Sequence, residues 1–425
     1  MKNLTERDAD VLWHPYTQMK LSPFSIAIEK GSGAYLFDYS GKQYIDAISS
    51  WWVNIHGHAH AQIAAAISKQ ANQLEQVIFA GFTHEPAITL AERLLPLLPA
   101  NQKKVFLSDN GSTAVEAALK MSIQFFANKN IQRHKIIAFK DAYHGDTFGS
   151  MSVSARGVFT QPFHQLLFDV VFIDTPTGFN TATVTAQLQD AIQQYAHEIC
   201  AFIFEPLVLG SAGMCMYPPE VLNKLMGIAK ANNIICIADE VMTGFGRTGK
   251  MFATEYLSVQ PDIICLSKGI TGGFLPLGAT TCTQEIFDAF WSNEKSNMLF
   301  HGHSYTGNAL ACAAAVASLQ VWQTECTLQK VQQIELLQQK FIANLTHHPK
   351  ISNARVCGTI AAFEVNAGSN SYLNPVKEKL VPYFLEQGVL LRPLGNTVYI
   401  LPPYCITESD LKHIFTVIEQ SLNLV

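Results

Sequence analysis

Short apolar runs alternate with helical stretches between about residue 61 and residue 325 of the chain. Each run is apolar throughout rather than at every second position, which indicates strands that are buried on both faces. Strands interleaved with helices favour a doubly wound, mostly parallel sheet. We therefore predict an α/β fold with strands over residues 103–109, 134–140, 168–174, 200–206, 233–240 and 262–268.

The segments on either side of this region have a different pattern. Residues 1–60 read as loops and short strands with turn signals, while residues 327–345 form an amphipathic helix that is followed by a few strands and two more helices. We predict an N-terminal segment over 1–60 that contributes to the small domain and to the site, a large domain over 61–325, and a small α+β domain over 326–425.

Composition changes this picture mainly by exclusion. Hydrophobic residues make up 48% and charged residues 15% of the chain, which suits a compact enzyme with much buried surface. The net charge of −5, without a basic run, argues against a nucleic-acid partner. No apolar segment is long enough to cross a membrane, and the first residues carry no secretory signal. The nine cysteines are scattered without a CxxC pair, so we expect free, buried thiols in a reducing cytoplasm.

Several polar residues directly follow the predicted strands. Ligands bind at the carboxyl ends of the strands in open parallel sheets. Residues at such ends include Ser108–Ser112, Glu205, Asp239 and Lys268. Lys268 comes after an apolar strand and before "GITGG", where desolvation would depress its pKa and make it a candidate for a Schiff base. A surface lysine after a strand is the alternative interpretation.

Asp239 and the residues after strand 103–109 offer complementary chemistry. A buried carboxylate at Asp239 can hold a pyridine nitrogen protonated, although a helix cap or a salt-bridged acid is the alternative. Gly111 and Ser112 stand where a helix begins, and helix N-termini bind phosphate. Thr113 with Glu116 fits a capping box, so an ordinary cap is the alternative there.

An aromatic side chain completes the set. Tyr143 follows another predicted strand and can stack on a flat ring, or simply pack half-buried in a loop. The chain contains neither GxGxxG nor a P-loop motif, so a nucleotide cofactor is not favoured. Together these residues predict a site for pyridoxal 5′-phosphate (PLP). They offer a phosphate-binding helix start, an aromatic ring for stacking, a carboxylate for the pyridine nitrogen and a lysine for the Schiff base.

The stretch "SSWWVNIHGHAH" raises a different hypothesis. His56, His58 and His60 stand at alternate positions and would share one face of a strand, as metal ligands can. However, no further ligand with suitable spacing follows, no HExxH motif occurs, and Gly57 interrupts the pattern. We therefore expect no metal and interpret the histidines as hydrogen-bonded structural residues around a turn.

Two longer stretches carry a family resemblance. "IADEVMTGFGRTGKMFATEYLSVQPDIICLSKGITGGFLPLGAT" and "GNALACAAAVASL" resemble the signature and the following helix of the class III aminotransferases of PLP fold type I. The resemblance extends over nearly the whole chain. It implies a PLP-dependent transaminase with a mostly parallel, seven-stranded-type sheet in the large domain, working as a homodimer whose sites are shared across the interface.

The resemblance also implies roles for individual residues around the cofactor. Lys268 would form the Schiff base and move the substrate proton, Asp239 would pair with the pyridine nitrogen, and Tyr143 would complete the catalytic set. The implied cofactor contacts are Val241 and Tyr143 on the two ring faces, Glu205 beside the ring hydroxyl, Gly111 and Ser112 at the phosphate, and His303 and Ser304 reaching that phosphate from the partner subunit.

Three shorter stretches, "WHPYTQM", "SSWWVNIHGH" and "FHGHSYTGN", resemble a narrower group within the family. Members of that group transfer an amino group from S-adenosyl-L-methionine to 8-amino-7-oxononanoate and form 7,8-diaminononanoate for biotin biosynthesis. The resemblance implies a substrate pocket lined by Tyr16, Trp51, Trp52, Tyr143, Asp146, Lys268, Gly302, Arg392 and Tyr399.

The types of these residues suit such substrates. Aromatic walls attract a sulfonium cation, stack on adenine and bury methylene groups at about 0.8 kcal/mol each. Arg392 can bind a carboxylate through two parallel hydrogen bonds, with a surface ion pair as the alternative. Asp146 stands where many class III members have arginine, which argues against glutamate as the usual donor. Lysine or another ω-amino acid as donor, and a PLP-binding protein without turnover, remain the alternatives.

Overall fold

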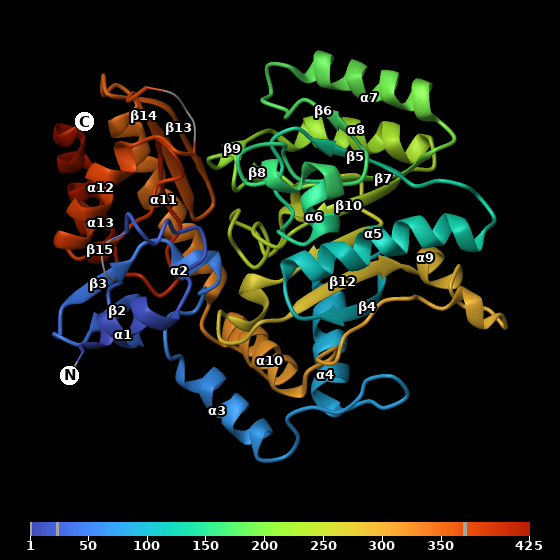
Figure 1. Cartoon of the computed structure of the whole chain (residues 1–425), viewed down its shortest axis with the longest axis horizontal. Coiled ribbons are helices and arrows are strands. Elements are labelled where there is room, and N and C mark those ends of the chain that lie inside the picture. The colour runs from blue at the N-terminus through green and yellow to red at the C-terminus, as the bar shows by residue number, and fades with distance from the viewer. Residues whose placement is uncertain (1, 23–24, 369–371) are drawn as a thin grey trace.

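The computed structural model describes residues 2–22, 25–368 and 372–425. A seven-stranded sheet lies at its centre, in the order β4-β12-β11-β10-β7-β5-β6 (Figure 1). The strands are β4 (Gln102–Ser108), β5 (Lys135–Phe139), β6 (Val170–Ile173), β7 (Ile199–Phe204), β10 (Ile235–Asp239), β11 (Ile263–Leu266) and β12 (Gly278–Thr283). All of them except β12 overlap the apolar runs predicted as strands.

Strand β12 lacks an apolar run because its sequence is GATTCT. It pairs antiparallel with both β4 and β11, whereas the other neighbouring strands of this sheet pair in parallel. Two of its threonines are buried and hydrogen-bonded: Thr280 Oγ1 donates to the carbonyl of Ala114, and Thr281 Oγ1 donates to Gln102 Oε1, both at 2.7 Å. The sheet is therefore mostly parallel, as predicted, with one antiparallel strand inserted.

Alternate residues of the central strands pack into two separate cores. In β10, Cys236 and Ala238 face one core, while Ile235 and Ile237 face the other. Helices α7 (Thr181–Tyr195) and α8 (Pro219–Ala231) contribute to the first core, and α5 (Gly111–Asn128) and α9 (Gln284–Asp288) to the second. Burial on both faces accounts for the continuous apolar runs and confirms the doubly wound arrangement.

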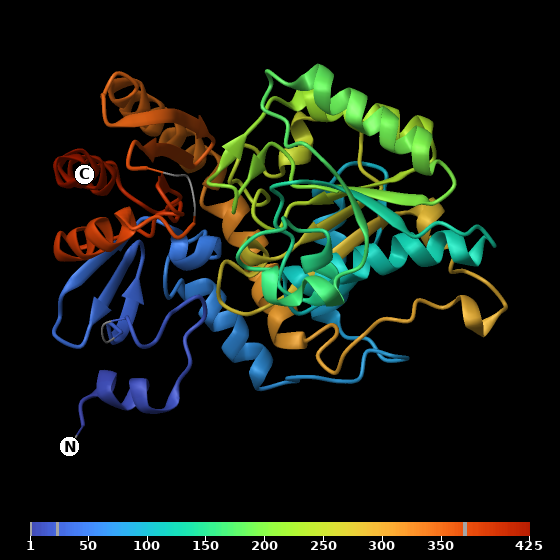
Figure 2. The same ribbon diagram turned by 45° about the horizontal axis from the view of Figure 1, so that its top comes forward.

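The N-terminal and C-terminal parts of the chain lie side by side (Figure 2), and they share a second sheet. Strands β1 (Ile28–Ser32), β2 (Tyr35–Asp38) and β3 (Gln43–Asp46) are joined by β15 (Val389–Leu390), which pairs in parallel with β3. A third sheet contains β13 (Ile351–Cys357), β14 (Ile360–Val365) and β16 (Thr397–Ile400). The N-terminal segment therefore belongs structurally with the C-terminal part, although most of the chain lies between them.

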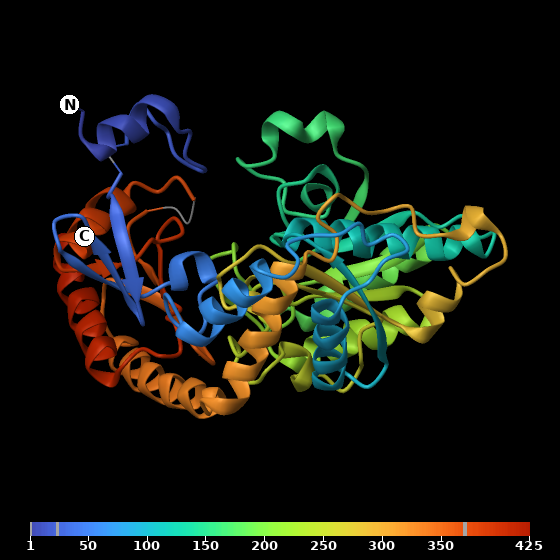
Figure 3. The ribbon, with the colours of Figure 1, turned by 90° about the horizontal axis from the view of Figure 1, so that it is seen from below.

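Helices connect the large sheet to the C-terminal part of the chain. Figure 3 shows α10 (Ala309–Thr324) and α11 (Thr327–Leu345) running from the large sheet to the C-terminal part. The other α-helices of the described residues are α1 (Leu4–Val11), α2 (Ser49–Trp52), α3 (Ala61–Ala71), α4 (Glu85–Leu94), α6 (Phe148–Ser152), α12 (Val376–Glu386) and α13 (Glu408–Ser421). Among the described residues, no helix is long and apolar enough to span a membrane.

Helix α2 is a tight, irregular turn rather than part of a strand. Ser49, Ser50 and Trp52 have positive φ angles of 52°, 60° and 66°. This backbone sends the two adjacent indoles to different surroundings, because Trp52 is 4% exposed and Trp51 is 40% exposed. The pair is therefore not one continuous wall.

The three histidines that follow the turn are hydrogen-bonded, as predicted. Their partners are Ser318 for His56 (3.1 Å), Asp46 for His58 (2.9 Å) and Glu325 for His60 (2.8 Å). Within the described ranges, no group of three His, Cys, Asp or Glu side chains is arranged to hold a metal ion.

The cysteines confirm one expectation and correct another. All nine are free, in keeping with the absence of a disulfide pattern. Five are buried and three are partly buried, but Cys326 is exposed, so the prediction of buried thiols is wrong at that position. Cys326 forms the turn between α10 and α11 with a φ of 51°, and such turns lie at the surface.

Candidate active site

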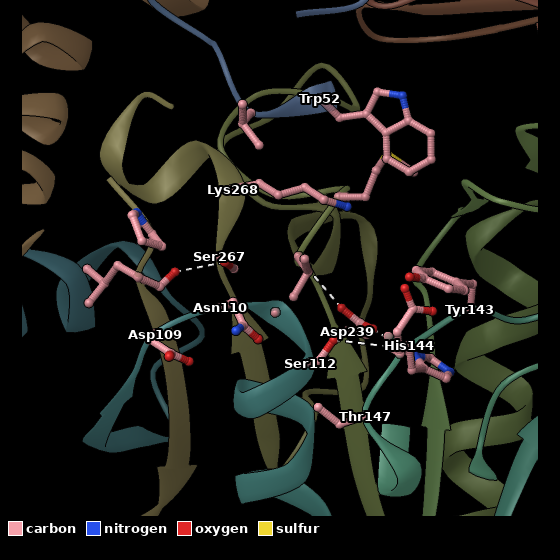
Figure 4. A pocket seen from close by; sticks show the side chains of 18 of the residues that line it. Trp52, Asp109, Asn110, Ser112, Tyr143, His144, Thr147, Asp239, Ser267 and Lys268 are labelled. Carbon is pink, nitrogen blue, oxygen red and sulfur yellow. Dashed lines mark hydrogen bonds and ion pairs between the residues drawn. The ribbon is translucent and has the colours of Figure 1, made fainter. Parts of the chain in front are cut away.

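A cavity of about 590 Å³ lies at the carboxyl ends of several strands of the large sheet. Its lining draws on the loop after β4, the loop after β5, the ends of β10 and β11, and the turn α2 (Figure 4). The predicted site residues among the lining are Trp52, Gly111, Ser112, Tyr143, Asp146, Glu205, Asp239, Val241 and Lys268. The structure thus brings together residues that lie far apart in the sequence, such as Trp52 and Lys268.

Lys268 begins the turn that follows β11, and its backbone has a left-handed φ of 46°. Its Nζ atom lies 4.6 Å from the ring centre of Trp52. Desolvation lowers the pKa of Lys268 to about 8, although the nearby carboxylates of Asp239 and Glu205 oppose the shift. A substantial share of the amine is therefore neutral and nucleophilic near that pH, which a surface lysine would not show.

Asp239 ends β10 and is buried. Its Oδ2 atom lies 2.6 Å from Nδ1 of His144, and its Oδ1 atom accepts a hydrogen bond from the backbone N–H of Val241 at 3.0 Å. His144 is a site residue that sequence analysis missed, although it directly follows Tyr143 in "YHGD". The imidazole fixes the carboxylate in place, so that Asp239 presents an oriented negative charge to the cavity.

The first turn of α5 differs in detail from the prediction. Asn110, not Thr113, is the N-cap: its Oδ1 accepts from the N–H of Thr113 at 3.0 Å, and Thr113 Oγ1 accepts from the N–H of Asn110 at 3.1 Å. The predicted capping box of Thr113 with Glu116 is wrong because the helix begins at Gly111, two residues before Thr113. Gly111 and Ser112 consequently occupy the first turn itself, where backbone N–H groups lack intrahelical partners.

Glu116 has a different function from the predicted one. Its Oε1 atom accepts from Thr147 Oγ1 at 2.5 Å and from the N–H groups of Gly149 and Ser150 at 2.8 and 3.1 Å. The N–H of Asp146 donates to Ser112 Oγ at 3.2 Å. These contacts fasten the loop that carries Tyr143, His144 and Asp146 to the start of α5.

Two glycines allow this close approach and leave a cradle at the helix start. A Cβ atom on Gly111 would come 2.7 Å from Cγ1 of Val241, and a Cβ on Gly145 would come 2.1 Å from Ser112 Oγ. The free N–H groups and the helix dipole favour an anion at this position. A phosphate therefore fits the cradle, with Asp239 and Lys268 lining the same cavity.

Glu205 lies buried at the back of the cavity. Its carboxylate accepts from the N–H groups of Tyr143 and Gly210, each at 3.0 Å. Burial nevertheless raises the pKa of Glu205 to about 7. The side chain can therefore change its protonation state near neutral pH.

Four of the predicted substrate residues form two contacting pairs at the turn α2: Trp52 with Tyr399, and Trp51 with Arg392. Trp52 Nε1 donates to the hydroxyl of buried Tyr399 at 3.0 Å, which fixes the indole beside Lys268. Trp51 lies under the guanidinium of Arg392, 5.2 Å from the ring centre. Within the described part of the chain, no carboxylate forms an ion pair with exposed Arg392, so the alternative of an intramolecular surface ion pair is not seen.

Tyr16 connects the N-terminal segment to the cavity. Its hydroxyl donates to Asp146 and lies 3.5 Å from the hydroxyl of Tyr143. Desolvation and the hydrogen bond with Asp146 raise the pKa of Tyr16 to about 12, so the hydroxyl keeps its proton. Asp146 therefore remains an acceptor that faces the cavity.

Like Tyr16, Trp51, Arg392 and Tyr399, three further predicted residues, which share one loop, lie outside the cavity lining of the single chain. His303 Nε2 lies 3.9 Å from Asp109 Oδ1, and the carbonyl of Ser304 accepts from the side-chain amide of Gln76 at 3.0 Å. Gly302 is in the same loop, and a Cβ atom on it would lie 3.9 Å from Thr306 Oγ1, at an ordinary contact distance. Their implied action on a partner subunit's site stays a prediction.

A family profile described as Aminotransferase class-III matches residues 16–422. The chain is a class III aminotransferase. Enzymes of this family use PLP, so the predicted cofactor agrees with the family, and the cavity has the residues to hold it.

Curated relatives align with this aminotransferase over almost its full length. It is 47% identical to the adenosylmethionine-8-amino-7-oxononanoate aminotransferase of Synechococcus elongatus, over 97% of this chain and 98% of the relative. The protein of the same name from Helicobacter pylori is 39% identical, over 97% of this chain and 95% of the relative.

Solved structures confirm the predicted fold type I. The adenosylmethionine-8-amino-7-oxononanoate aminotransferase of Methanocaldococcus jannaschii has a TM-score of 0.94 at 36% identity, over 99% of both chains. An omega transaminase from Pseudomonas jessenii in complex with PMP has the same TM-score of 0.94 at 27% identity, over 99% of this chain and 98% of that chain.

Proposed function

We propose that this aminotransferase transfers an amino group from S-adenosyl-L-methionine to 8-amino-7-oxononanoate, with PLP as its cofactor, and so forms 7,8-diaminononanoate in biotin biosynthesis. The names of the relatives from Synechococcus elongatus, Helicobacter pylori and Methanocaldococcus jannaschii support this choice. The single observation that carries the donor assignment is the carboxylate of Asp146, which lines a cavity with aromatic walls.

The cofactor would be held by the residues at the strand ends. Gly111 and Ser112 would bind the phosphate through the start of α5, and Val241 and Tyr143 would flank the ring. Asp239, oriented by His144, would keep the pyridine nitrogen protonated. PLP, when bound, supplies an electron sink for the negative charge that develops at the substrate Cα atom.

Lys268 would perform the proton transfers. Its amine would hold the cofactor covalently and would become free once the donor amine is bound. Because the pKa of Lys268 is lowered to about 8, the released amine can take the Cα proton of the donor and return a proton afterwards. The buried position of the amine beside Trp52 limits competing reactions with water.

Donor and acceptor would use the same pocket in turn. The sulfonium cation of the donor suits a wall that combines the anion of Asp146 with the hydroxyl groups of Tyr16 and Tyr143. The acceptor is a long alkyl chain with a terminal carboxylate, which suits the aromatic walls and the guanidinium of Arg392. Because one pocket accepts both molecules, each is expected to inhibit at high concentration.

The decisive experiment follows the first half-reaction by absorbance. Purified enzyme loaded with PLP is mixed with S-adenosyl-L-methionine, L-lysine or L-glutamate, and the visible band of the lysine-bound cofactor is recorded. We expect S-adenosyl-L-methionine to convert the band to that of the pyridoxamine form. Conversion by lysine or glutamate but not by S-adenosyl-L-methionine would overturn the donor assignment. Lys268→Ala serves as the control, since it should lack the starting band.

We also propose a homodimer with shared sites in the cytoplasm. The loop with Gly302, His303 and Ser304 lies outside the cavity of its own chain, which supports its use by a partner subunit. The nine free cysteines support a reducing compartment.

A further inference from the structure

A row of four aromatic rings adjoins the cavity. Its members, in order, are Tyr372, Phe159, Tyr16 and Trp51, which come from four segments that lie far apart in the sequence. Neighbouring ring centres are 4.5, 5.6 and 5.6 Å apart, with interplanar angles of 70°, 80° and 58°. Tilted and edge-to-face contacts of this kind attract each other, so the row is a continuous surface rather than a set of isolated rings.

The row is connected to the reacting centre. The hydroxyl of Tyr16 contacts Asp146 and Tyr143, and both of these line the cavity. Tyr16, Trp51 and Phe159 are 41%, 40% and 39% exposed, so much of each ring stays open to a ligand. A substrate in the cavity can therefore extend along these rings.

Charges are placed along the row in a definite order. Lys377 Nζ lies 4.9 Å from the ring centre of Tyr372, and the guanidinium of Arg392 lies 5.2 Å from that of Trp51. Asp146 accepts the hydroxyl of Tyr16 between these two ends. The row thus offers a series of inclined apolar ring faces, with one anion at its middle and a cation at each end.

The direction of the row decides which part of a substrate each ring meets. The reacting amino group must reach Lys268. Arg392, which lies over Trp51, can bind the carboxylate beside that amino group, so the Trp51 end of the row would meet the amino-acid end of the donor. The rings beyond Tyr16 are farther along the row, and they would meet the opposite end of the substrate. In S-adenosyl-L-methionine that opposite end is the flat adenine, and Asp146 stands where the sulfonium passes. The acceptor has no flat group to place there.

We propose that Phe159 and Tyr372 are specificity-determining residues that bind the adenine end of the donor. This inference rests on the proposed function, because it concerns the same pocket. Phe159 belongs to the loop after α6, and Tyr372 to the C-terminal part, so the adenine would contact both parts of the molecule at once.

The experiment compares the two substrates in steady-state kinetics of the PLP-loaded enzyme. Phe159→Ala is expected to raise KM for S-adenosyl-L-methionine about tenfold or more, since an aromatic ring that stacks on a base contributes on that scale. KM for 8-amino-7-oxononanoate should change by less than about threefold and kcat should change little, since one ring edge adds only weak contacts to an alkyl chain. Tyr372→Ala should act in the same direction, and Phe159→Trp should restore the low KM.

Phe163 provides a matched control. It lies in the short 3-10 helix Gln161–Leu166 that follows the loop of Phe159, is also 39% exposed and contacts Phe148 rather than the row. Phe163→Ala should leave both KM values near those of the native enzyme, and thermal melting should show that all the variants fold. Equal rises in both KM values for Phe159→Ala, or an equal effect of Phe163→Ala, would overturn the inference.

Binding of adenosine separates this inference from the donor assignment. Adenosine has the flat adenine ring but no amino group that the enzyme can transfer. Calorimetry with adenosine therefore measures binding to the row without turnover. Native enzyme that binds adenosine, with binding weakened by Phe159→Ala and not by Phe163→Ala, supports the row even if S-adenosyl-L-methionine fails as a donor. Unchanged adenosine binding in Phe159→Ala refutes the row even if S-adenosyl-L-methionine is the donor.

Discussion

Lys268 shows how burial moves the pKa of a site lysine towards neutral pH. Burial removes water from the amine and favours its neutral form, which lowers the pKa from 10.5 to about 8. The carboxylates of Asp239 and Glu205 favour the charged form and limit the shift. The balance leaves an amine that can be charged or neutral close to physiological pH, as an acid–base catalyst requires.

This balance predicts a pH profile for cofactor attachment. In enzyme stripped of PLP, the initial rate of attachment should rise with pH and reach half its maximum near pH 8, because only the neutral amine reacts and its pKa is about 8. The measurement is the growth of the visible band after PLP is added at each pH. Asp239→Asn removes a charge that raises the pKa of Lys268, so its midpoint should move to lower pH. A midpoint near 10 in the native enzyme would contradict the buried amine.

At the scale of the element, the first turn of α5 contributes both to the stability of the helix and to the lining of the cavity. Asn110 satisfies the N–H of Thr113, and the residues between them, Gly111 and Ser112, line the cavity. The cap therefore stabilises the helix and also holds the proposed phosphate contacts in position. Loss of the cap is expected to affect both properties.

Asn110→Ala should lower the free energy of unfolding by about 1 kcal/mol and also weaken PLP binding, because the first turn frays without its cap. Urea unfolding and the dissociation constant of PLP measure the two effects. Thr407 caps α13 with the same reciprocal pattern, accepting from the N–H of Asp410 at 3.1 Å, but it does not line the cavity. Thr407→Ala should cost similar stability and leave PLP affinity unchanged. Equal loss of PLP affinity in both variants would show that the effect is global.

The elements also show what sequence patterns can and cannot reveal. Strands buried on both faces were predictable because every position is apolar, as in Ile235–Asp239 up to its last residue. Strand β12 was not, since Thr280 and Thr281 satisfy their hydroxyl groups through distant partners. His144 lies beside a predicted residue, but its partner Asp239 is 95 positions away, and no local pattern indicates such a pair.

The two tryptophans show the same limit at a finer level. Because the two residues are adjacent in the sequence, both indoles were expected to line the substrate pocket. Only the positive φ angles of the turn separate the buried Trp52 from the exposed Trp51. The polar residues at strand ends were predictable because the topology of a parallel sheet places them at one edge.

At the scale of the whole molecule, the loop with His303 and Ser304 raises the question of subunit cooperation. If the sites are shared, a Lys268→Ala subunit and a subunit with both His303→Ala and Ser304→Ala can combine to form one native site. Mixing the two inactive proteins after reversible dissociation should restore about a quarter of the native activity, because half of the dimers are mixed and each has one intact site. No restoration, with mixed dimers demonstrated by native mass spectrometry, would show that each chain builds its own site.

The shared sheet of β3 and β15 has a consequence for how such enzymes diversify. Lys268 and Asp239 belong to the large sheet, whereas Arg392 and Tyr399 belong to the C-terminal part. The proposed proton-transfer residues and this part of the proposed substrate pocket are therefore encoded in separate stretches of the chain, so that the second can vary while the first stays fixed. The omega transaminase from Pseudomonas jessenii has a TM-score of 0.94 at only 27% identity, so the fold is retained while most of the sequence differs. For laboratory evolution of new donors, libraries confined to residues 372–400 should retain reactive enzymes far more often than libraries placed around β10 and β11.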